Sequence, residues 1–215
     1  MEIAPAPTLT GDRVTLEPLA QEHAEDLRAA VTDGDLWRTW YTSVPAPAQV
    51  EDEIDRRLAE HEAGRMVPFA VRDRPTGRVV GSTTFMNIDA GNRHVEIGST
   101  FLAKSAQRSG INTEAKLLML SHAFEAWQCI AVEFRTHWHN HQSRAAIAGL
   151  GAKQDGVLRN HSIGRDGTLR DTVVFSIIAS EWPAVRLSLA ERLRRHDRAE
   201  GRAAGPPGTP DRQSV

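Results

Sequence analysis

The chain has 215 residues, 40% of them hydrophobic and 25% charged, an ordinary composition for one globular domain. Its formal net charge is −2, whereas nucleic-acid-binding proteins carry an excess of basic residues. We therefore do not expect a nucleic acid as a partner. Residues 1–10 lack the basic start and apolar core of a secretory signal, and no apolar run is long enough to cross a bilayer. We therefore expect a cytoplasmic protein without a membrane partner.

The N-terminal third is predicted to hold one strand followed by two helices. Residues 1–8 are rich in proline, and we expect them to be disordered. Alternation and helical spacing then predict a strand over 13–19, a helix over 23–31 and a second helix over 48–62.

An aromatic cluster interrupts this pattern between the two helices. Trp37, Trp40 and Tyr41 lie within five positions, and two prolines follow them. One interpretation is a small satellite core under a loop, which we favour for Trp37. The other is one wall of an acceptor-substrate pocket, because loops on a rigid scaffold commonly carry specificity.

The middle of the chain reads as antiparallel hairpins followed by a crossing helix. Alternation and turn residues predict strands over 68–73, 78–88 and 94–102. A helix over 112–127 presents its apolar residues on one stripe, and a strand over 131–136 follows it. A crossing helix would place that strand parallel to the one over 94–102.

The last part is predicted to close the sheet. It holds a short helix over 140–150, a terminal hairpin of strands 157–163 and 172–178, and a last helix over 181–195. From residue 197 the chain is rich in glycine, proline and charge, and we expect it to be disordered. The one cysteine, Cys129, has apolar neighbours that predict a small buried residue and not a nucleophile.

A polar loop with one glycine separates the strand over 94–102 from the long helix. It contains Gln107, Arg108, Ser109 and Gly110. The first N–H groups of a helix have no partner within it, and the helix dipole places partial positive charge there. The loop matches neither the P-loop pattern nor the dinucleotide fingerprint. Its residues alone leave two readings open, a phosphate site and an ordinary strand-to-helix turn.

The order of residues in this loop resembles the Q/R-x-x-G-x-G/A motif of the GNAT acetyltransferase superfamily, with Asn112 in place of the last Gly or Ala. The resemblance extends from about residue 9 to about residue 193. It is nearest to the branch of ribosomal-protein N-terminal acetyltransferases, the RimJ/RimL-like group. It is carried by LTGDRVTL at 9–16, EIG at 96–98, N-x-x-S at 140–143 and the pattern at 149–159. It implies an α/β fold, a GNAT-type α/β sandwich with a mixed, mostly antiparallel sheet, splayed at the acyl-CoA site and flanked by helices.

The resemblance implies that acetyl-CoA (coenzyme A) is the cofactor. The pyrophosphate would be held by Gln107, Arg108, Ser109, Gly110, Ile111, Asn112 and Thr113. The pantetheine arm would pair with the main chain of Thr100, Phe101 and Leu102 and bond to Asn140, and Arg144 could reach an adenosine phosphate. Asn140 also suits a capping role at the start of its helix.

Three side chains are candidates for the chemistry of acetyl transfer. Ser143 would assist the leaving sulfur, which needs a proton or a dipole. Glu96 could accept the amine proton if burial raises its pKa, and Asp155 stands where some members carry a catalytic glutamate. For both carboxylates a structural role remains open. Phe175 replaces a tyrosine that is common in this branch, which leaves more of the proton transfer to Ser143.

Histidines 137, 139 and 141 alternate along the chain just before the short helix. Such spacing invites a metal site, but no carboxylate or cysteine partner is evident, and we predict none. His139 is instead a candidate for the mouth of the acceptor site, beside Trp37, Trp40 and Tyr41.

The leading hypothesis is an acetyl-CoA-dependent N-acetyltransferase, a single domain over residues 9–196. It would transfer acetyl directly, in a ternary complex, to a primary amine on a protein N-terminus or a small molecule. The alternative is a non-catalytic acyl-CoA-binding or regulatory protein on the same fold, which the loss of tyrosine at Phe175 would support. A homodimer fits the family's habit, and the sequence is silent on it.

Overall fold

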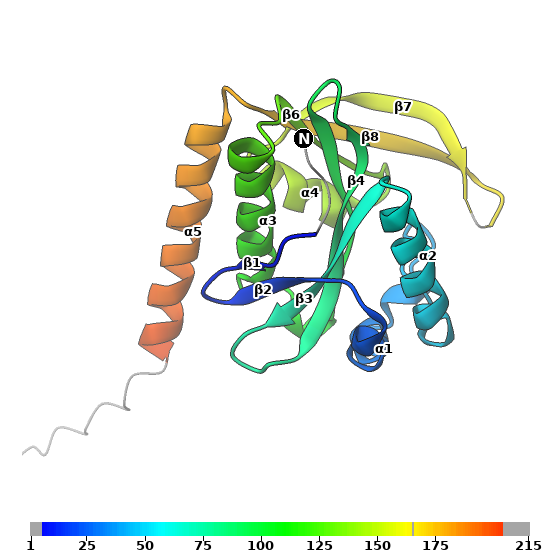
Figure 1. Ribbon diagram of the computed structural model, residues 1–215, viewed down its shortest axis with the longest axis horizontal. Coiled ribbons are helices and arrows are strands. Elements are labelled where there is room, and N and C mark those ends of the chain that lie inside the picture. Colours follow the sequence, from blue (N-terminus) through cyan, green and yellow to red (C-terminus); the bar gives the residue numbers. More distant parts are fainter. Residues whose placement is uncertain (1–5, 165, 204–215) are drawn as a thin grey trace, which may run out of the picture.

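One mixed sheet forms the centre of the protein (Figure 1). Within residues 6–164 and 166–203, which the computed structural model describes apart from the side chains of 200–203, it has eight strands in the order β1-β2-β3-β4-β5-β6-β8-β7. They are β1 (Leu9–Thr10), β2 (Val14–Pro18), β3 (Met66–Asp73), β4 (Val79–Asp89), β5 (His94–Leu102), β6 (Ala131–His137), β7 (Lys153–Ile163) and β8 (Leu169–Ile178). Among these described strands only β5 and β6 pair parallel, so the predicted mixed sheet is confirmed.

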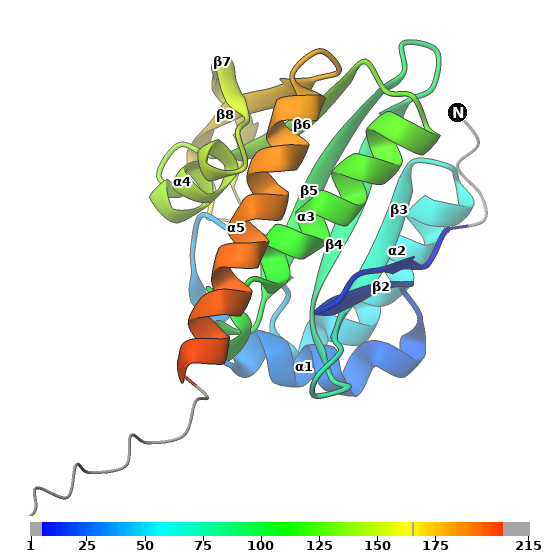
Figure 2. The ribbon, with the colours of Figure 1, turned by 90° about the vertical axis from the view of Figure 1, so that its left-hand side faces the viewer.

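Helices cover both faces of this sheet (Figures 1 and 2). On one face lie α1 (Ala24–Thr32) and α2 (Val50–Glu62); on the other, α3 (Ile111–Ser121) packs beside α5 (Trp182–Ala203), and α4 (His141–Gly149) lies against β6 and β8. Short 3-10 turns precede or connect them at Gln21–His23, Leu36–Arg38, Pro47–Gln49 and Lys104–Ala106. None of the described helices is both long and apolar enough to span a membrane.

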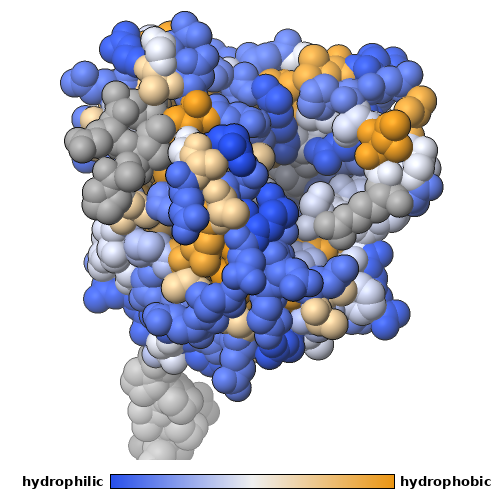
Figure 3. Space-filling model, turned by 45° about the vertical axis from the view of Figure 1, so that its right-hand side comes forward, coloured by the Kyte–Doolittle hydropathy of each residue, from blue (hydrophilic) through white to orange (hydrophobic). Residues whose placement is uncertain are grey.

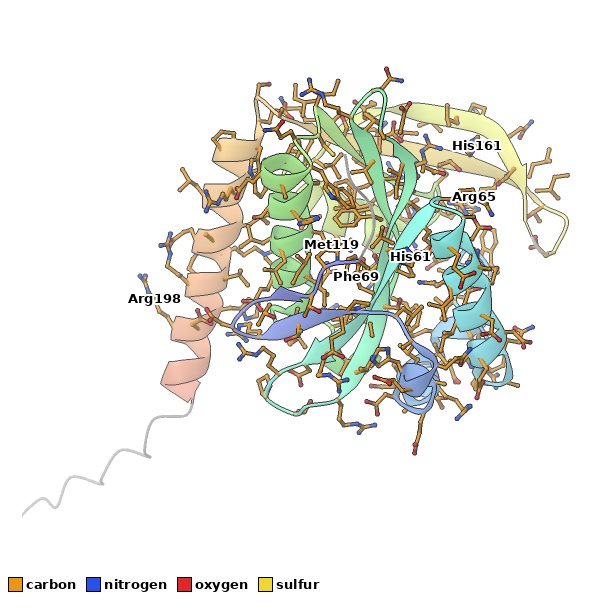
Figure 4. All side chains as sticks on the ribbon, viewed as in Figure 1. His61, Arg65, Phe69, Met119, His161 and Arg198 are labelled. Atoms are coloured by element: carbon orange, nitrogen blue, oxygen red, sulfur yellow. The ribbon has the colours of Figure 1, made fainter. Side chains whose placement is uncertain are left out.

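The main core lies between the sheet and α3. Met119 of α3 and Phe69 of β3 are fully buried (Figure 4). β3 is buried on both faces from Met66 to Val71, and Met119 lies on the buried stripe of α3. This core fixes the beginning of α3 relative to the end of β5, where the polar loop lies.

Several predicted elements differ from the structure at their ends. β7 begins at Lys153 and β8 at Leu169, four and three residues before their predicted starts at 157 and 172. The helix predicted over 112–127 is α-helical only to Ser121 and then widens into a π turn, His122–Ala126. The wider turn places the rings of His122 and Trp127 against Phe85, 6.2 and 4.6 Å from it between centroids. Spacing along the sequence carries no signal for one extra residue in a turn.

The last helix is longer than predicted. The disordered tail predicted from residue 197 is wrong as far as Ala203, because α5 continues to that residue. Asp197 pairs with Arg13 on the neighbouring hairpin, a contact that supports the helix beyond its predicted end. Residues 1–5 and 204–215 of the two predicted disordered ends lie outside the described residues.

Candidate active site

The sheet opens between its two parallel strands. β5 and β6 pair at His94–Ala131, Val95–Val132 and Glu96–Glu133, and their pairing ends there. From Ile97 to Leu102, β5 continues without a strand partner on that side among the described residues. The splayed sheet expected from the resemblance is therefore confirmed, and Glu96 lies at the apex of the split.

A β-bulge shapes the open edge of β5. Thr84 pairs with Gly98 and Ser82 with Phe101, so Thr83 alone faces both Ser99 and Thr100. Ser99 has φ 47°, and both bulged residues are exposed. Bulges are common beside active sites, where they redirect the main chain. The open N–H and C=O groups here suit a ligand that pairs as an extra strand.

The loop after β5 presents main-chain N–H groups. Gly110 precedes α3 with φ 86°, and Arg108 is left-handed with φ 64°. Gly110 is the N-cap residue of α3 and has no side chain with which to cap the first turn. The side chains of Ile111 and Thr113 are buried, which leaves their main chain for a ligand, while Arg108 is exposed. The N–H groups at the start of a helix, a close approach of the backbone and an exposed positive charge fit a diphosphate.

A hairpin from the N-terminus fixes this loop in place. The guanidinium of Arg13, at the β1–β2 turn, donates to the carbonyl oxygen of Ser109 at 3.1 Å. The Glu114 carboxylate, in the first turn of α3, accepts hydrogen bonds from main-chain N–H groups of the β1–β2 turn, those of Asp12, Arg13 and Val14. The LTGDRVTL stretch thus supports the loop from behind.

Gln107 links the two sides of the split at its wide end. Its amide nitrogen donates to Leu102 O at 3.1 Å, and its amide oxygen accepts from Gln142 of α4 at 3.2 Å. Gln142 was not among the predicted site residues, although its place two residues after Asn140 could have indicated it. The Gln107 side chain therefore already occupies one carbonyl expected to face the pantetheine arm.

Three predicted residues lie at the start of α4, on the β6 side of the split. Asn140 Oδ1 accepts the Ser143 N–H at 2.9 Å, so the capping role is present and the amide nitrogen remains for a ligand. Ser143 is half-buried, and its hydroxyl has no hydrogen bond within the described residues. Arg144 lies over the Trp138 ring, 4.3 Å from the centroid, and would have to leave it to reach a phosphate.

The surroundings of Glu96 change the pKa of its carboxyl group. It is 5% exposed and accepts a hydrogen bond from Asn87 Nδ2 at 2.7 Å. Arg135 Nε lies 3.5 Å from the same oxygen and also bonds to Glu133. Burial raises the pKa of Glu96 above its ordinary value of 4.5, against the opposing effects of Asn87 and Arg135. A raised pKa improves a carboxylate as a proton acceptor near neutral pH.

The second candidate carboxylate lies elsewhere. Asp155 is exposed on β7, at the far edge of the sheet, and accepts a hydrogen bond from Ser176 of β8. Three strand spacings, about 14 Å, separate β7 from β5. The structure does not bring Asp155 to Glu96.

An aromatic recess opens on the surface between the α1–α2 connection and the β7–β8 hairpin. The Trp40 ring lies 5.4 Å from Tyr41, 5.0 Å from His137 and 5.7 Å from His139 between centroids. The recess has a volume of about 340 Å³, and Figure 3 shows this face hollowed beside the hairpin. It is lined by Trp40, His137, Trp138, His139, Arg159, Asn160, Thr168, Leu169 and Asp171.

The structure thus gathers Trp40, Tyr41 and His139 but not Trp37. Trp37 is half-buried, with the Arg38 guanidinium 4.8 Å over its ring. His137 was missed as a site residue; it is 6% exposed and accepts a hydrogen bond from the His139 N–H. Burial lowers the pKa of His137 below its ordinary 6.5, so the ring is neutral at pH 7. Among the described residues, no group of three or more potential ligands is arranged to hold a metal ion.

A protein-family model and several solved structures are similar to this chain. The protein-family model for the Acetyltransferase (GNAT) domain matches residues 13–153 of this chain. A GCN5-related N-acetyltransferase from Brucella melitensis is 29% identical, with a TM-score of 0.79 over 88% of this chain and 86% of that chain. RimJ of Mycobacterium smegmatis, in complex with CoA-disulfide, is 25% identical, with a TM-score of 0.75 over 88% of this chain and 96% of that chain.

One further structure shares the fold. The microcin C7 self-immunity acetyltransferase MccE, in complex with acetyl-CoA and AMP, is 19% identical, with a TM-score of 0.69 over 82% of this chain and 98% of that chain. A search of the curated proteins found no match.

Proposed function

The chain belongs to the GNAT acetyltransferase family, and from this premise we propose that it transfers an acetyl group to a primary amine by direct attack in a ternary complex. GNAT acetyltransferases use acetyl-CoA, which when bound supplies the thioester carbonyl that the amine attacks. The observation that carries the proposal is the buried Glu96 at the apex of the split. The nearness to RimJ supports a place in the RimJ/RimL-like branch.

In this proposal the residues on each side of the split have separate roles in binding or in proton transfer. The N–H groups after Gly110, with Arg108, hold the diphosphate, and the open edge of β5 and Asn140 hold the pantetheine arm. Glu96 takes a proton from the acceptor ammonium, directly or through water. The Ser143 hydroxyl donates its proton or a hydrogen bond to the leaving sulfur. Positioning both reactants in one split supplies a large part of the rate by itself.

The anion site is tested by charge reversal in the loop. We expect a variant with Arg108→Glu and Gly110→Glu to lose at least tenfold in affinity for acetyl-CoA, since it adds two negative charges and a strained φ where a diphosphate lies. Isothermal titration calorimetry measures this beside Arg65→Glu, a charge reversal at the exposed end of α2 (Figure 4). Equal affinity of the loop variant and the wild type would refute the assignment of the loop.

The acceptor recess is tested by truncating its aromatic wall. We expect Trp40→Ala to raise KM for the acceptor amine about five- to tenfold, because an ammonium is attracted to aromatic faces, and to leave affinity for acetyl-CoA unchanged. Trp37→Ala is the matched control and should change KM less. If the two variants raise KM equally, the recess is not the acceptor site.

The same assay decides between enzyme and binding protein. The alternative, an acyl-CoA-binding protein without catalysis, is favoured by one observation: Phe175 is buried opposite Phe134 and offers no hydroxyl to the split. Release of free coenzyme thiol across a panel of amines, small molecules and peptide N-termini, supports the enzyme. Tight binding of acetyl-CoA with no thiol release beyond spontaneous hydrolysis supports the alternative.

A further inference from the structure

A lysine is buried directly behind the open edge of β5. Lys116, on α3, is 5% exposed, and its amine donates to Thr83 Oγ1 at 2.7 Å and to Thr100 Oγ1 at 2.8 Å. The two hydroxyls are 2.7 Å apart, so the three groups form a closed triangle. Met119, three residues further along α3, also contacts Thr83 and faces the sheet (Figure 4).

An amine in this position is unfavourable for the fold by itself. No carboxylate pairs with Lys116 among the described residues, and burial lowers its pKa to about 7. A buried amine that lacks an ionic partner costs more free energy than an apolar side chain of the same length. Lys116 shares a stripe with Met119, Leu120 and Ala123, all fully buried, where methionine or leucine would pack at lower cost.

Thr100 connects the buried lysine to the split. Thr83 is fully buried, whereas Thr100 belongs to the bulge and is exposed at the split. The Thr100 hydroxyl also lies 3.3 Å from the carbonyl oxygen of Gly98, on the other side of the bulge. A continuous set of hydrogen bonds therefore joins the buried amine to the main chain that lines the split.

A second buried cation holds the same bulge from the opposite face. Arg57 of α2 is 4% exposed and donates to Ser99 O at 3.3 Å and to the hydroxyls of Ser82 and Thr84. Arg57 is paired with Glu53, so its charge is compensated. The bulge is thus held between Arg57 of α2 and Lys116 of α3, and of these two side chains only Arg57 has an ionic partner within the described residues.

We propose that Lys116 is a positioning residue for the cofactor: through Thr100 it holds the bulged segment of β5 in the conformation that pairs with the pantetheine arm. This inference rests on the proposed function, because it takes β5 as the edge that binds acetyl-CoA. Lys116 is not a catalytic residue in this scheme, since it reaches the split only through Thr100.

The experiment compares Lys116→Met, Thr100→Val and Thr100→Ser, with Lys153→Met on β7 as an exposed-lysine control. Methionine keeps the length of the side chain without its donors, and valine keeps the shape of threonine without its hydroxyl. Hydrogen exchange of the amides of residues 99–102 is measured without cofactor. Affinity for acetyl-CoA is measured by calorimetry, and the melting temperature is recorded for each protein.

We expect Lys116→Met and Thr100→Val to exchange these amides faster and to bind acetyl-CoA about tenfold more weakly, the effect of losing one charge-assisted hydrogen bond. Thr100→Ser should bind more tightly than Thr100→Val. A double variant that combines Lys116→Met with Thr100→Val should bind no more weakly than either single variant, because both changes remove the same connection. The melting temperature of Lys116→Met should be equal to the wild-type value or higher, which a merely structural lysine would not give.

Wild-type exchange and affinity in Lys116→Met would overturn the inference. If that variant does not fold, Thr100→Val decides: wild-type exchange and affinity there overturn it equally. If the wild type itself binds no acetyl-CoA, the proposed function fails, and exchange in the cofactor-free proteins still decides whether Lys116 orders the bulge.

Discussion

Replacing Glu96 by Gln is expected to lower kcat about a hundredfold or more while leaving affinity for acetyl-CoA within twofold of the wild-type value. Glutamine has the same shape and can keep a bond to Asn87, but it cannot accept a proton from the acceptor ammonium. Steady-state kinetics with an accepted amine and calorimetry with acetyl-CoA measure the two quantities separately.

Glu133→Gln is the matched control for this variant. Glu133 pairs in register with Glu96 on the adjacent strand and bonds to the same arginine, Arg135, but is not buried. We expect its loss to cost far less in kcat. Equal losses in both variants would assign the effect to the charge network around Arg135 and would remove Glu96 as the base.

The pH dependence gives a second test of the same residue. A base acts only when ionised, so kcat/KM should rise with pH through the pKa of Glu96. Since burial raises that pKa above 4.5, this limb should lie at higher pH than an exposed glutamate would give. The limb should be absent in Glu96→Gln. A limb retained in that variant would mean that another group, such as the amine itself, determines it.

The sequence predicts the strand–loop–helix unit well because its determinants are local. The apolar stripe of α3 indicates its buried face, and Gly110 indicates the left-handed turn before it. Burial along β5 does not alternate, because Val95, Glu96 and Ile97 are all buried. The splayed strands follow from the family resemblance, since the end of pairing at Glu96 and Glu133 depends on two segments distant in sequence.

Side-chain partners at long range are what sequence reasoning misses. His137 looks like one of three alternating histidines, and only the fold places it against Trp40. Lys116 carried a usable signal: it falls on the stripe of Met119, Leu120 and Ala123, where a charged residue is unexpected. Asp155 was predicted as a site residue but lies away from the split. Its place in the motif pattern does not reveal that β8 and β6 lie between it and the split.

Glu114→Ala is expected to lower the free energy of unfolding by about 3 kcal/mol or more, the largest stability effect that we predict for one side chain. The buried carboxylate accepts the main-chain N–H groups of Asp12, Arg13 and Val14 at 3.0, 2.7 and 2.7 Å. Its removal leaves three donors at the β1–β2 turn without an acceptor. The approach is so close that a Cβ on Gly11 would lie 2.5 Å from the Glu114 side chain.

Urea unfolding measures this loss, with Glu62→Ala as a control on the exposed end of α2 that should change stability by less than about 0.5 kcal/mol. Because the same turn carries Arg13, which bonds to Ser109 O, the Glu114 variant should also bind acetyl-CoA more weakly in its folded state. A loss of stability at the control's level would mean that water replaces the carboxylate at the turn. A large loss with unchanged cofactor affinity would show that the hairpin stabilises the fold without shaping the loop.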